Sequence, residues 1–318
     1  MLINQQAGKT ALKFKFFFVL FIAVMFLSAC SSQSAVPTEP AQPTSAEVQP
    51  FVISAIPDQD PEKLNRLYGS LAAYLSERLG VPVEYKAVTD YTASVTALKV
   101  GDLDMVWYGG LTGVQARLQV PGAQAILQRN IDAEFHSVFI ANSSSDLAPF
   151  EDISGLASLK DHSFTFGSES STSGRLMPQY FLKQAGVTLQ DFHGEPGFSG
   201  SHDKTIQLVE AGTYQAGVVN EQVWKTRTQN NEVDLTKVKV LWTTPAYFDY
   251  HWVIRPGVAE RYGADFLANL KNAFMALDAT DPQQKEILDL FGATKFVETQ
   301  NSNYDKIEEV ARELGKIQ

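Results

Sequence analysis

The sequence has a single cysteine, Cys30, among its 318 residues. One thiol can form neither a disulfide framework within the chain nor a thiolate metal cluster, so both architectures are excluded. Basic residues are also scarce: there are 26 lysines and arginines against 36 aspartates and glutamates, a formal net charge of −10. Because a nucleic-acid backbone is bound by a basic surface, this balance argues against a nucleic-acid partner. A glycine-rich P-loop with its lysine is missing too, which argues against nucleotide hydrolysis.

The N-terminal region contains one long apolar run, FFFVLFIAVMFL at residues 16–27, behind a segment with three lysines and no acidic residue. Twelve helical residues span about 18 Å, which is too short for a bilayer core of about 30 Å but typical of a secretory signal. The run is followed by Leu27-Ser28-Ala29-Cys30, which resembles a bacterial lipobox, where the cysteine becomes the lipidated first residue. The alternative is an ordinary signal with a stray cysteine. We predict a lipoprotein signal peptide at 1–29 and lipidation of Cys30.

Residues 30–50 are rich in proline, serine and threonine and have few large apolar side chains. Such a segment cannot bury a core, so the sequence predicts a flexible linker here. Without residues 1–29 the chain loses three lysines and no acidic residue, and its net charge becomes −13. We therefore expect an acidic folded domain, periplasmic or otherwise extracytoplasmic, that is anchored to a membrane through Cys30.

From Phe51 onward, short β-type runs alternate with amphipathic helical stretches, the pattern of an α/β fold. Asp60-Pro61 places a capping residue and a first-turn proline at the start of one helix, and Gly80 ends it. The pattern predicts strands at 51–56, 83–88, 104–108, 125–128, 134–142, 163–166, 215–219, 238–242 and 251–254. It predicts helices at 61–79 and 90–98, from about 172, 203 and 221, and near 258–277, 282–290 and 303–316.

The polar run Asn142-Ser143-Ser144-Ser145-Asp146 separates two such series of strands and helices. The simplest topology has two lobes, with the second inserted into the first. Lobe 1 then comprises 51–142 and 248–318, and lobe 2 comprises 143–247. Ligands of such α/β folds bind in crevices lined by strand ends and helix N-termini. We therefore expect the functional site between the lobes.

The strongest local signal is the hydroxyl-rich stretch Gly167-Ser168-Glu169-Ser170-Ser171-Thr172-Ser173-Gly174, between a predicted strand and a predicted helix. Hydroxyls at a helix start can bind an anion beside free backbone N–H groups and the positive end of the helix dipole. Three successive hydroxyl residues are more than one helix cap requires, although plain capping with a solvated loop is the alternative. We predict that Ser171, Thr172 and Ser173 bind an anion.

A second signal is Gly200-Ser201-His202-Asp203, again at a predicted helix start. Its letters suggest a Ser-His-Asp triad, but adjacent helical residues point about 100° apart and cannot face one another. His202 either donates to the same anion from across the crevice or is an ordinary surface histidine. Asp203 is interpreted as a helix cap. A single His-Asp pair is weak evidence for a metal site, and none is predicted.

Together these stretches resemble the phosphonate- and phosphite-binding proteins of bacterial ABC importers, the PhnD-like family. The similar stretches are DYTASV, VWYGGLTGVQA, TFGSESSTSGRLMPQYFL, GFSGSHDKTI and TPAYFDYHWVIRP, in the family's order, and the resemblance covers about 51–300. It implies a two-lobed periplasmic-binding-protein fold, type II-like, that closes on its ligand in the inter-lobe crevice.

Carried over by position, the resemblance implies that Ser171, Thr172 and Ser173 grip the phosphonyl oxygens. It implies further donors from Tyr91, Tyr108 and His202, and it places Glu221 where the family receives an amino substituent of the ligand. Where an aminophosphonate binder has a second carboxylate, an ungapped match puts Tyr250, with Asp249 one position earlier. The predicted ligand-binding residues are therefore Tyr91, Tyr108, Ser171, Thr172, Ser173, His202, Glu221, Asp249 and Tyr250.

We predict a substrate-binding lipoprotein that captures a small phosphorus oxyanion (phosphonate, phosphite or phosphate) and delivers it to an ABC permease in the membrane. Neutral donors and helix dipoles allow local anion binding by an acidic protein. No covalent chemistry, cofactor or metal is expected. The alternatives are a binding protein for another tetrahedral oxyanion such as selenate, a sensor subunit of the same fold, and a secreted hydrolase using His202 and a serine. The hydrolase lacks a nucleophile elbow and a third triad member.

Overall fold

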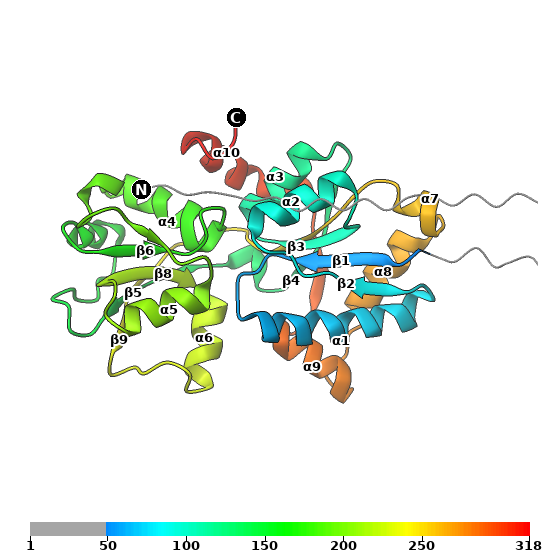
Figure 1. Ribbon diagram of the computed structural model, residues 1–318, viewed down its shortest axis with the longest axis horizontal. Coiled ribbons are helices and arrows are strands. Elements are labelled where there is room, and N and C mark those ends of the chain that lie inside the picture. Colours follow the sequence, from blue (N-terminus) through cyan, green and yellow to red (C-terminus); the bar gives the residue numbers. More distant parts are fainter. Residues whose placement is uncertain (1–48) are drawn as a thin grey trace, which may run out of the picture. The chain divides into compact units, whose positions relative to one another are not determined.

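The computed structural model describes residues 49–318. Cys30, the predicted signal peptide 1–29 and nearly all of the predicted linker 30–50 lie outside the described residues, so these stay predictions. The described residues belong to one compact unit, which contains two β-sheets. Figure 1 shows helices on both sides of each sheet. Within residues 49–318 we find no helix whose length and apolar character would let it span a membrane.

The first sheet, with its helices, forms lobe 1. Its spatial strand order is β11 (Phe296–Glu298), β4 (Gln124–Arg129), β10 (His251–Ile254), β3 (Met105–Tyr108), β1 (Phe51–Ala55) and β2 (Val83–Tyr85). β1 pairs in parallel with β2 and β3, whereas β10 runs antiparallel to β3 and β4. One side of this sheet carries α1 (Pro61–Leu79) and α9 (Pro282–Phe291), and the other carries α2 (Tyr91–Val100) and α3 (Gly110–Gln119), as Figure 1 shows. The later helices are α7 (Val258–Tyr262), α8 (Phe266–Met275) and α10 (Asp305–Glu313).

The second sheet, with its helices, forms lobe 2. Its strand order is β7 (Gly197–Phe198), β6 (Phe164–Phe166), β8 (Ala216–Asn220), β5 (Ser137–Asn142) and β9 (Val238–Thr243). In Figure 1, α4 (Met177–Gln184) covers one side, and α5 (His202–Glu210) and α6 (Glu221–Gln229) cover the other. The short helical turns are η1 (Asp132–Glu134), η2 (Ile153–Leu159), η3 (Thr172–Leu176), η4 (Leu189–Asp191) and η5 (Asn301–Tyr304).

Helix α1 shows why many elements begin and end where the sequence predicts. The Asp60 side chain accepts hydrogen bonds from the backbone N–H groups of Glu62 at 3.0 Å and Lys63 at 3.1 Å. Pro61 occupies the first helical position, where a missing N–H costs nothing. Gly80 ends the helix in the left-handed conformation, at a φ of 68°. The helix between these two ends buries an apolar face that contains Leu64, Leu67, Tyr68, Leu71 and Leu75.

Two segments, 130–136 and 244–250, join the lobes. The predicted boundary after residue 142 differs from the structure, because β5 pairs with β8 and β9 in the second sheet. β5 is buried along its whole length, and a strand buried on both faces has no alternating pattern that assigns it to one lobe. The joining segments pair with each other: Phe135 and Tyr247 exchange two backbone hydrogen bonds of 3.0 Å. The N–H of Asp249 donates to the carbonyl of Asp132 at 3.0 Å.

Candidate ligand-binding site

The hydroxyl-rich turn at Ser171, Thr172 and Ser173 is buried where the lobes meet. Its helix begins with the π-turn η3 rather than as an α-helix, and the Ser171 hydroxyl caps it by accepting from the N–H of Gly174 at 2.9 Å. From lobe 1, the N–H of Leu111 donates to Thr172 Oγ1 at 2.8 Å. Because Oγ1 accepts this bond, the Thr172 hydroxyl keeps a proton that it can donate to a ligand or to the neighbouring Asp249 carboxyl. π-turns are frequent at functional sites.

His202 is buried, and its ring is held as one tautomer. The backbone N–H of Asn220 donates to His202 Nδ1 at 3.3 Å, so Nδ1 carries no proton. Burial lowers the pKa of His202 to about 4, so the neutral ring carries its proton on Nε2. Nε2 lies 3.4 Å from the Tyr250 hydroxyl, a long contact that leaves this N–H available to an anion. A Cβ on Gly174 would lie 3.1 Å from His202 Cε1, so the ring packs directly against η3.

Tyr91 supplies another donor from lobe 1. It follows the capping residue Asp90 at the start of α2, and its side chain is buried. Its hydroxyl has no hydrogen-bond partner among the described residues. Burial raises the pKa of Tyr91 well above its ordinary value, Asp58 adds to the rise, and the nearby Ser171 hydroxyl partly offsets it. The hydroxyl therefore keeps its proton, beside the turn that offers the other donors.

The carboxyl of Asp249 is the acceptor in this cluster. Oδ1 accepts from the N–H of Gly110 at 2.9 Å, whereas Oδ2 is buried without a partner in the described part of the chain. A Cβ on Gly109 would lie 3.0 Å from Thr172 Oγ1 and 3.1 Å from Asp249 Oδ1, so a glycine permits this close approach. Burial raises the pKa of Asp249 to about 7, although the Gly110 N–H and the hydroxyls of Ser173 and Thr172 lower it in part. At neutral pH the group is poised between acid and carboxylate.

Tyr250 can offer a ligand only its ring, because its hydroxyl is already hydrogen-bonded to two other residues of the protein. The hydroxyl donates to Asp58 Oδ2 at 2.7 Å and accepts from Asn220 Nδ2 at 2.9 Å. The ring stacks on Trp107, with 5.8 Å between centroids, and the guanidinium of Arg129 lies 4.9 Å from its centroid. These contacts hold the Tyr250 ring in place through Trp107, Arg129 and the two hydrogen bonds of its hydroxyl, so Tyr250 is a rigid wall beside His202.

Tyr108 was predicted to donate to the ligand, but its hydroxyl is engaged inside lobe 1. It donates to the carbonyl of Ser94 at 2.8 Å, and both residues are buried. This bond ties the end of β3 to α2, the helix that begins with Tyr91. Tyr108 therefore supports the position of Tyr91, while its own proton is already used.

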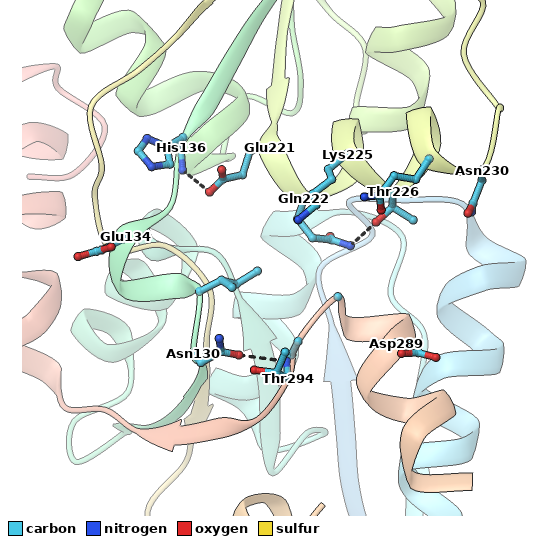
Figure 2. A pocket seen from close by; sticks show the side chains of 14 residues that line it. Asn130, Glu134, His136, Glu221, Gln222, Lys225, Thr226, Asn230, Asp289 and Thr294 are labelled. Carbon is cyan, nitrogen blue, oxygen red and sulfur yellow. Dashed lines mark hydrogen bonds between the residues drawn. The ribbon is translucent and has the colours of Figure 1, made fainter. Parts of the chain in front are cut away.

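Glu221 lies apart from the cluster as well. It begins α6, and its Oε1 accepts from the backbone N–H of His136 at 3.0 Å. Figure 2 shows Glu221 and His136 with Lys225 around a separate cavity of about 600 Å³. At this strand-to-helix junction the side chain directed to Tyr250 belongs to Asn220, the residue before Glu221.

Sequence reasoning assigned no site role to Asp58, Ser137 or Asn220. Asp58 is buried, and burial raises its pKa to about 6, while the hydrogen bond from Tyr250 lowers it in part. The Ser137 hydroxyl donates to the backbone carbonyl of Ser173 at 2.7 Å. A usable signal existed for two of them, because Asp58 follows β1 and Asn220 ends β8, and ligands of α/β sheets bind at such strand ends.

The cluster combines donors from Tyr91, Thr172 and His202 with one acceptor, Asp249. A set in which donors predominate suits an anion, and a carboxyl poised to hold a proton suits an anion that keeps one. Within residues 49–318, no group of three or more His, Cys, Asp or Glu side chains is placed to hold a metal ion. The arrangement is therefore suited to binding a small anion.

Two lobes joined by a paired strip, with a buried set of polar side chains between them, define a ligand-binding protein of the two-lobed periplasmic type. The family model described as "ABC transporter, phosphonate, periplasmic substrate-binding protein" matches residues 53–304. The chain therefore belongs to the family of periplasmic substrate-binding proteins of phosphonate ABC transporters, and the predicted family and two-lobed α/β fold are confirmed.

Individual relatives agree with this assignment. The chain is 45% identical over 278 residues to the probable ABC transporter phosphite binding protein PhnD1 of Prochlorococcus marinus (strain MIT 9301), covering 87% of this chain and 94% of that protein. It is 25% identical over 231 residues to the phosphate-import protein PhnD of Mycolicibacterium smegmatis, covering 69% of each. The solved structure of PhnD1 from Prochlorococcus marinus in complex with methylphosphonate superposes with a TM-score of 0.82 at 46% identity, covering 84% of this chain and 98% of that one.

Proposed function

We propose that this protein captures a small phosphorus oxyanion, of the size of phosphite or methylphosphonate, and delivers it to the permease of an ABC importer. The observation that carries this proposal is a set of buried polar atoms left without partners. The Tyr91 hydroxyl and Asp249 Oδ2 have none among the described residues, and His202 Nε2 has only a long contact. Each unpaired buried group costs about 1–3 kcal/mol, which a bound ligand recovers. The relative bound to methylphosphonate supports this ligand class.

The Asp249 carboxyl favours a phosphorus oxyanion over sulfate or selenate. Above about pH 7 the Asp249 carboxylate is ionised and has only acceptors, so it repels an anion that carries no proton. Phosphite and alkylphosphonates can keep a proton near neutral pH, whereas sulfate and selenate do not. Because burial raises the pKa of Asp249 to about 7, the carboxyl and the ligand can share one proton.

The surroundings of Tyr250 favour a small, uncharged substituent on phosphorus. The Tyr250 ring stands where the resemblance expects a carboxylate for an ammonium group, and the Asn220 amide is occupied by the Tyr250 hydroxyl. Asp58 Oδ2 already accepts from the Tyr250 hydroxyl, and burial raises the pKa of Asp249 to about 7, so neither carboxyl is a ready partner for an ammonium group near neutral pH. We therefore propose hydrogen or methyl, rather than an aminoalkyl chain, as the favoured substituent.

The position of His202 favours binding without covalent chemistry. In a Ser-His-Asp triad, Nδ1 donates to a carboxylate and Nε2 contacts the serine hydroxyl. Here Nδ1 accepts from the Asn220 N–H instead, and within residues 49–318 no serine hydroxyl is bonded to the His202 ring. We propose that the protein is not an enzyme and needs no cofactor.

We also propose that a lipid on Cys30 holds the protein at an extracytoplasmic membrane surface, where the permease lies. The support comes from the sequence, in which the lone cysteine follows the apolar run 16–27 and Leu27-Ser28-Ala29. Residues 30–50 would then act as a tether long enough to let the folded domain turn toward the permease.

A ligand screen by thermal shift and isothermal titration calorimetry tests the proposal. The probes are phosphite, methylphosphonate, phosphate, 2-aminoethylphosphonate, sulfate and selenate. Phosphite and methylphosphonate should stabilise the protein most, by about 2.7 kcal/mol at a hundredfold excess over Kd. The Thr172→Ala variant, which lacks a donor hydroxyl, should lose most of this stabilisation. Preferential stabilisation by selenate or sulfate would refute a phosphorus oxyanion as the ligand.

A further inference from the structure

A contact between the lobes lies outside the ligand-binding cluster, where α1 and α5 begin. The backbone N–H of Asp60 in lobe 1 donates to Asp203 Oδ2 in lobe 2 at 2.6 Å, across 143 positions of the sequence. Beside it, the N–H of His202 donates to the carbonyl of Asp58 at 3.0 Å. Both bonds join the segment that follows β1 to the first turn of α5. The N-termini of two helices therefore meet at this point.

Asp203 is held ready for this contact by its own lobe. Its Oδ1 accepts from Arg227 Nη1 of α6 at 2.8 Å, and the two side chains are only 11% and 18% exposed. Because Asp203 and Arg227 both belong to lobe 2, their ion pair is independent of how the lobes are placed. The bond to Asp60 forms only when the lobes are together. Asp203 thus presents a fixed, charged acceptor to lobe 1.

Charge explains why an aspartate suits this position. The N-terminus of a helix carries partial positive charge, so two N-termini that meet repel each other unless negative charge lies between them. The Asp60 side chain caps α1, and the Asp203 carboxylate accepts the Asp60 N–H from the first turn of α5. The attraction between the Asp203 carboxylate and the N-terminus of α1 thus replaces the repulsion between the N-termini of α1 and α5.

We propose that Asp203 is a positioning residue for ligand capture, which stabilises the closed arrangement of the lobes through the Asp60–Asp203 contact without touching the ligand. Both carboxylate oxygens of Asp203 are occupied, and its side chain lines a separate cavity of about 610 Å³ with Lys63 and Arg227. This inference rests on the proposed function. Ligand donors come from lobe 1 through Tyr91 and from lobe 2 through His202, so release requires the lobes to part.

A matched pair of variants isolates the Asp60 N–H. Asp60→Ala removes the capping side chain and keeps the N–H, whereas Asp60→Pro removes both. The φ of −55° at Asp60 is one that proline adopts. In stopped-flow measurements with phosphite and methylphosphonate, Asp60→Pro should dissociate about tenfold faster than Asp60→Ala, which corresponds to about 1.4 kcal/mol. The association rates of the two variants should agree within about twofold, since a ligand first meets open lobes. Equal dissociation rates in the pair overturn the proposal.

Asp203→Ala provides the second arm, with Asp305→Ala as its control, because Asp305 also lies in the first turn of a helix but is exposed. Asp203→Ala should speed dissociation about tenfold, and adding it to Asp60→Pro should have little further effect, because both remove one bond. Full additivity of the two effects overturns the proposal.

Amide hydrogen exchange separates this inference from the proposed function. Without added ligand the lobes alternate between open and closed arrangements, and the N–H groups of Asp60 and His202 are protected only in the closed one. These two N–H groups should therefore exchange faster in Asp203→Ala than in the wild type or in Asp305→Ala. Unchanged exchange at both positions overturns the role of Asp203. If the wild type binds neither phosphite nor methylphosphonate, the proposed function fails, and the exchange result still decides whether the Asp60–Asp203 contact holds the lobes together.

Discussion

Replacing Asp249 with asparagine tests whether the protein and its ligand share one proton. An asparagine keeps an oxygen to accept the Gly110 N–H, which Asp249 Oδ1 accepts at 2.9 Å, and it puts an amide NH₂ in place of the unpartnered Oδ2. Burial raises the pKa of the wild-type carboxyl to about 7. To bind an oxyanion, this carboxyl must either be protonated itself or accept a hydrogen bond from a protonated ligand. The amide donates at every pH.

The expected magnitude follows from the pKa. Asp249 is protonated below about 7 and becomes an anion above it, and the ligand also loses its last proton near neutrality. Once the shared proton is gone, each further pH unit costs about tenfold in affinity, or about 1.4 kcal/mol. Asp249 is half protonated at pH 7 and about one-hundredth protonated at pH 9, so over this range the wild type should lose about 50-fold in affinity for phosphite, about 2.3 kcal/mol. Asp249→Asn should lose less than about fivefold over the same range.

Titration calorimetry at pH 6 to pH 9, in pairs of buffers with different ionisation enthalpies, measures both the affinity and the number of protons taken up. The wild type should take up close to one proton per phosphite at the alkaline end, and Asp249→Asn close to none. The control is Glu221→Gln, which changes a carboxylate in the separate cavity of Figure 2 and should leave the pH dependence as in the wild type. Equal slopes for the wild type and Asp249→Asn would refute the shared proton. A flattened slope in Glu221→Gln would assign that role to Glu221.

Four further outcomes are expected. Thr172→Ala should weaken phosphite binding by about 1.5–3 kcal/mol, the range for a hydrogen bond to a charged group, whereas a change confined to the melting temperature would leave Thr172 with a structural role only. Gly109→Ala should weaken binding at least about tenfold in calorimetry, because its Cβ would lie 3.0 Å from Thr172 Oγ1, and unchanged affinity would contradict the close approach. Cys30→Ser should move the protein from the membrane to the soluble fraction, and retention with detergent-extracted membrane protein would exclude the anchor. The pKa of Asp249 is raised on folding from 3.8 to about 7, so its stabilising effect is present below pH 3.8 and is lost as the pH rises through about 7. In chemical denaturation without ligand, the free energy of unfolding of Asp249→Asn should therefore rise relative to that of the wild type by up to about 4 kcal/mol between pH 4 and pH 8.

The elements of this fold could be predicted where local chemistry determines them. The strand predicted at 251–254 is β10, and the helix predicted at 61–79 is α1, because caps, proline and glycine act within a few residues. The lobe boundary could not be placed at β5, since pairing with β8 and β9 depends on residues far along the chain.

The candidate site divides in the same way. The turn at Ser171–Ser173 is local, and its hydroxyls are visible in the sequence. At the junction after β8, by contrast, a shift of one position decides whether Asn220 or Glu221 is directed to Tyr250, because adjacent side chains diverge by about 100° once a helix begins. The bond from Tyr250 to Asp58 joins residues 192 positions apart, and no local pattern announces such a pair.

The strip that joins the lobes limits how they can move. Two independent flexible connections would let one lobe swing, twist and slide relative to the other. Here segments 130–136 and 244–250 are bonded to each other through Phe135 and Tyr247 and through Asp132 and Asp249. A two-stranded ribbon bends far more easily than its strands slide past each other, so we expect the lobes to open and close mainly by one hinge-bending motion. Because Asp249 lies in that ribbon, the acceptor that we propose for the ligand stays near the axis of rotation, and the proposed donors of the two lobes approach it along one repeatable arc.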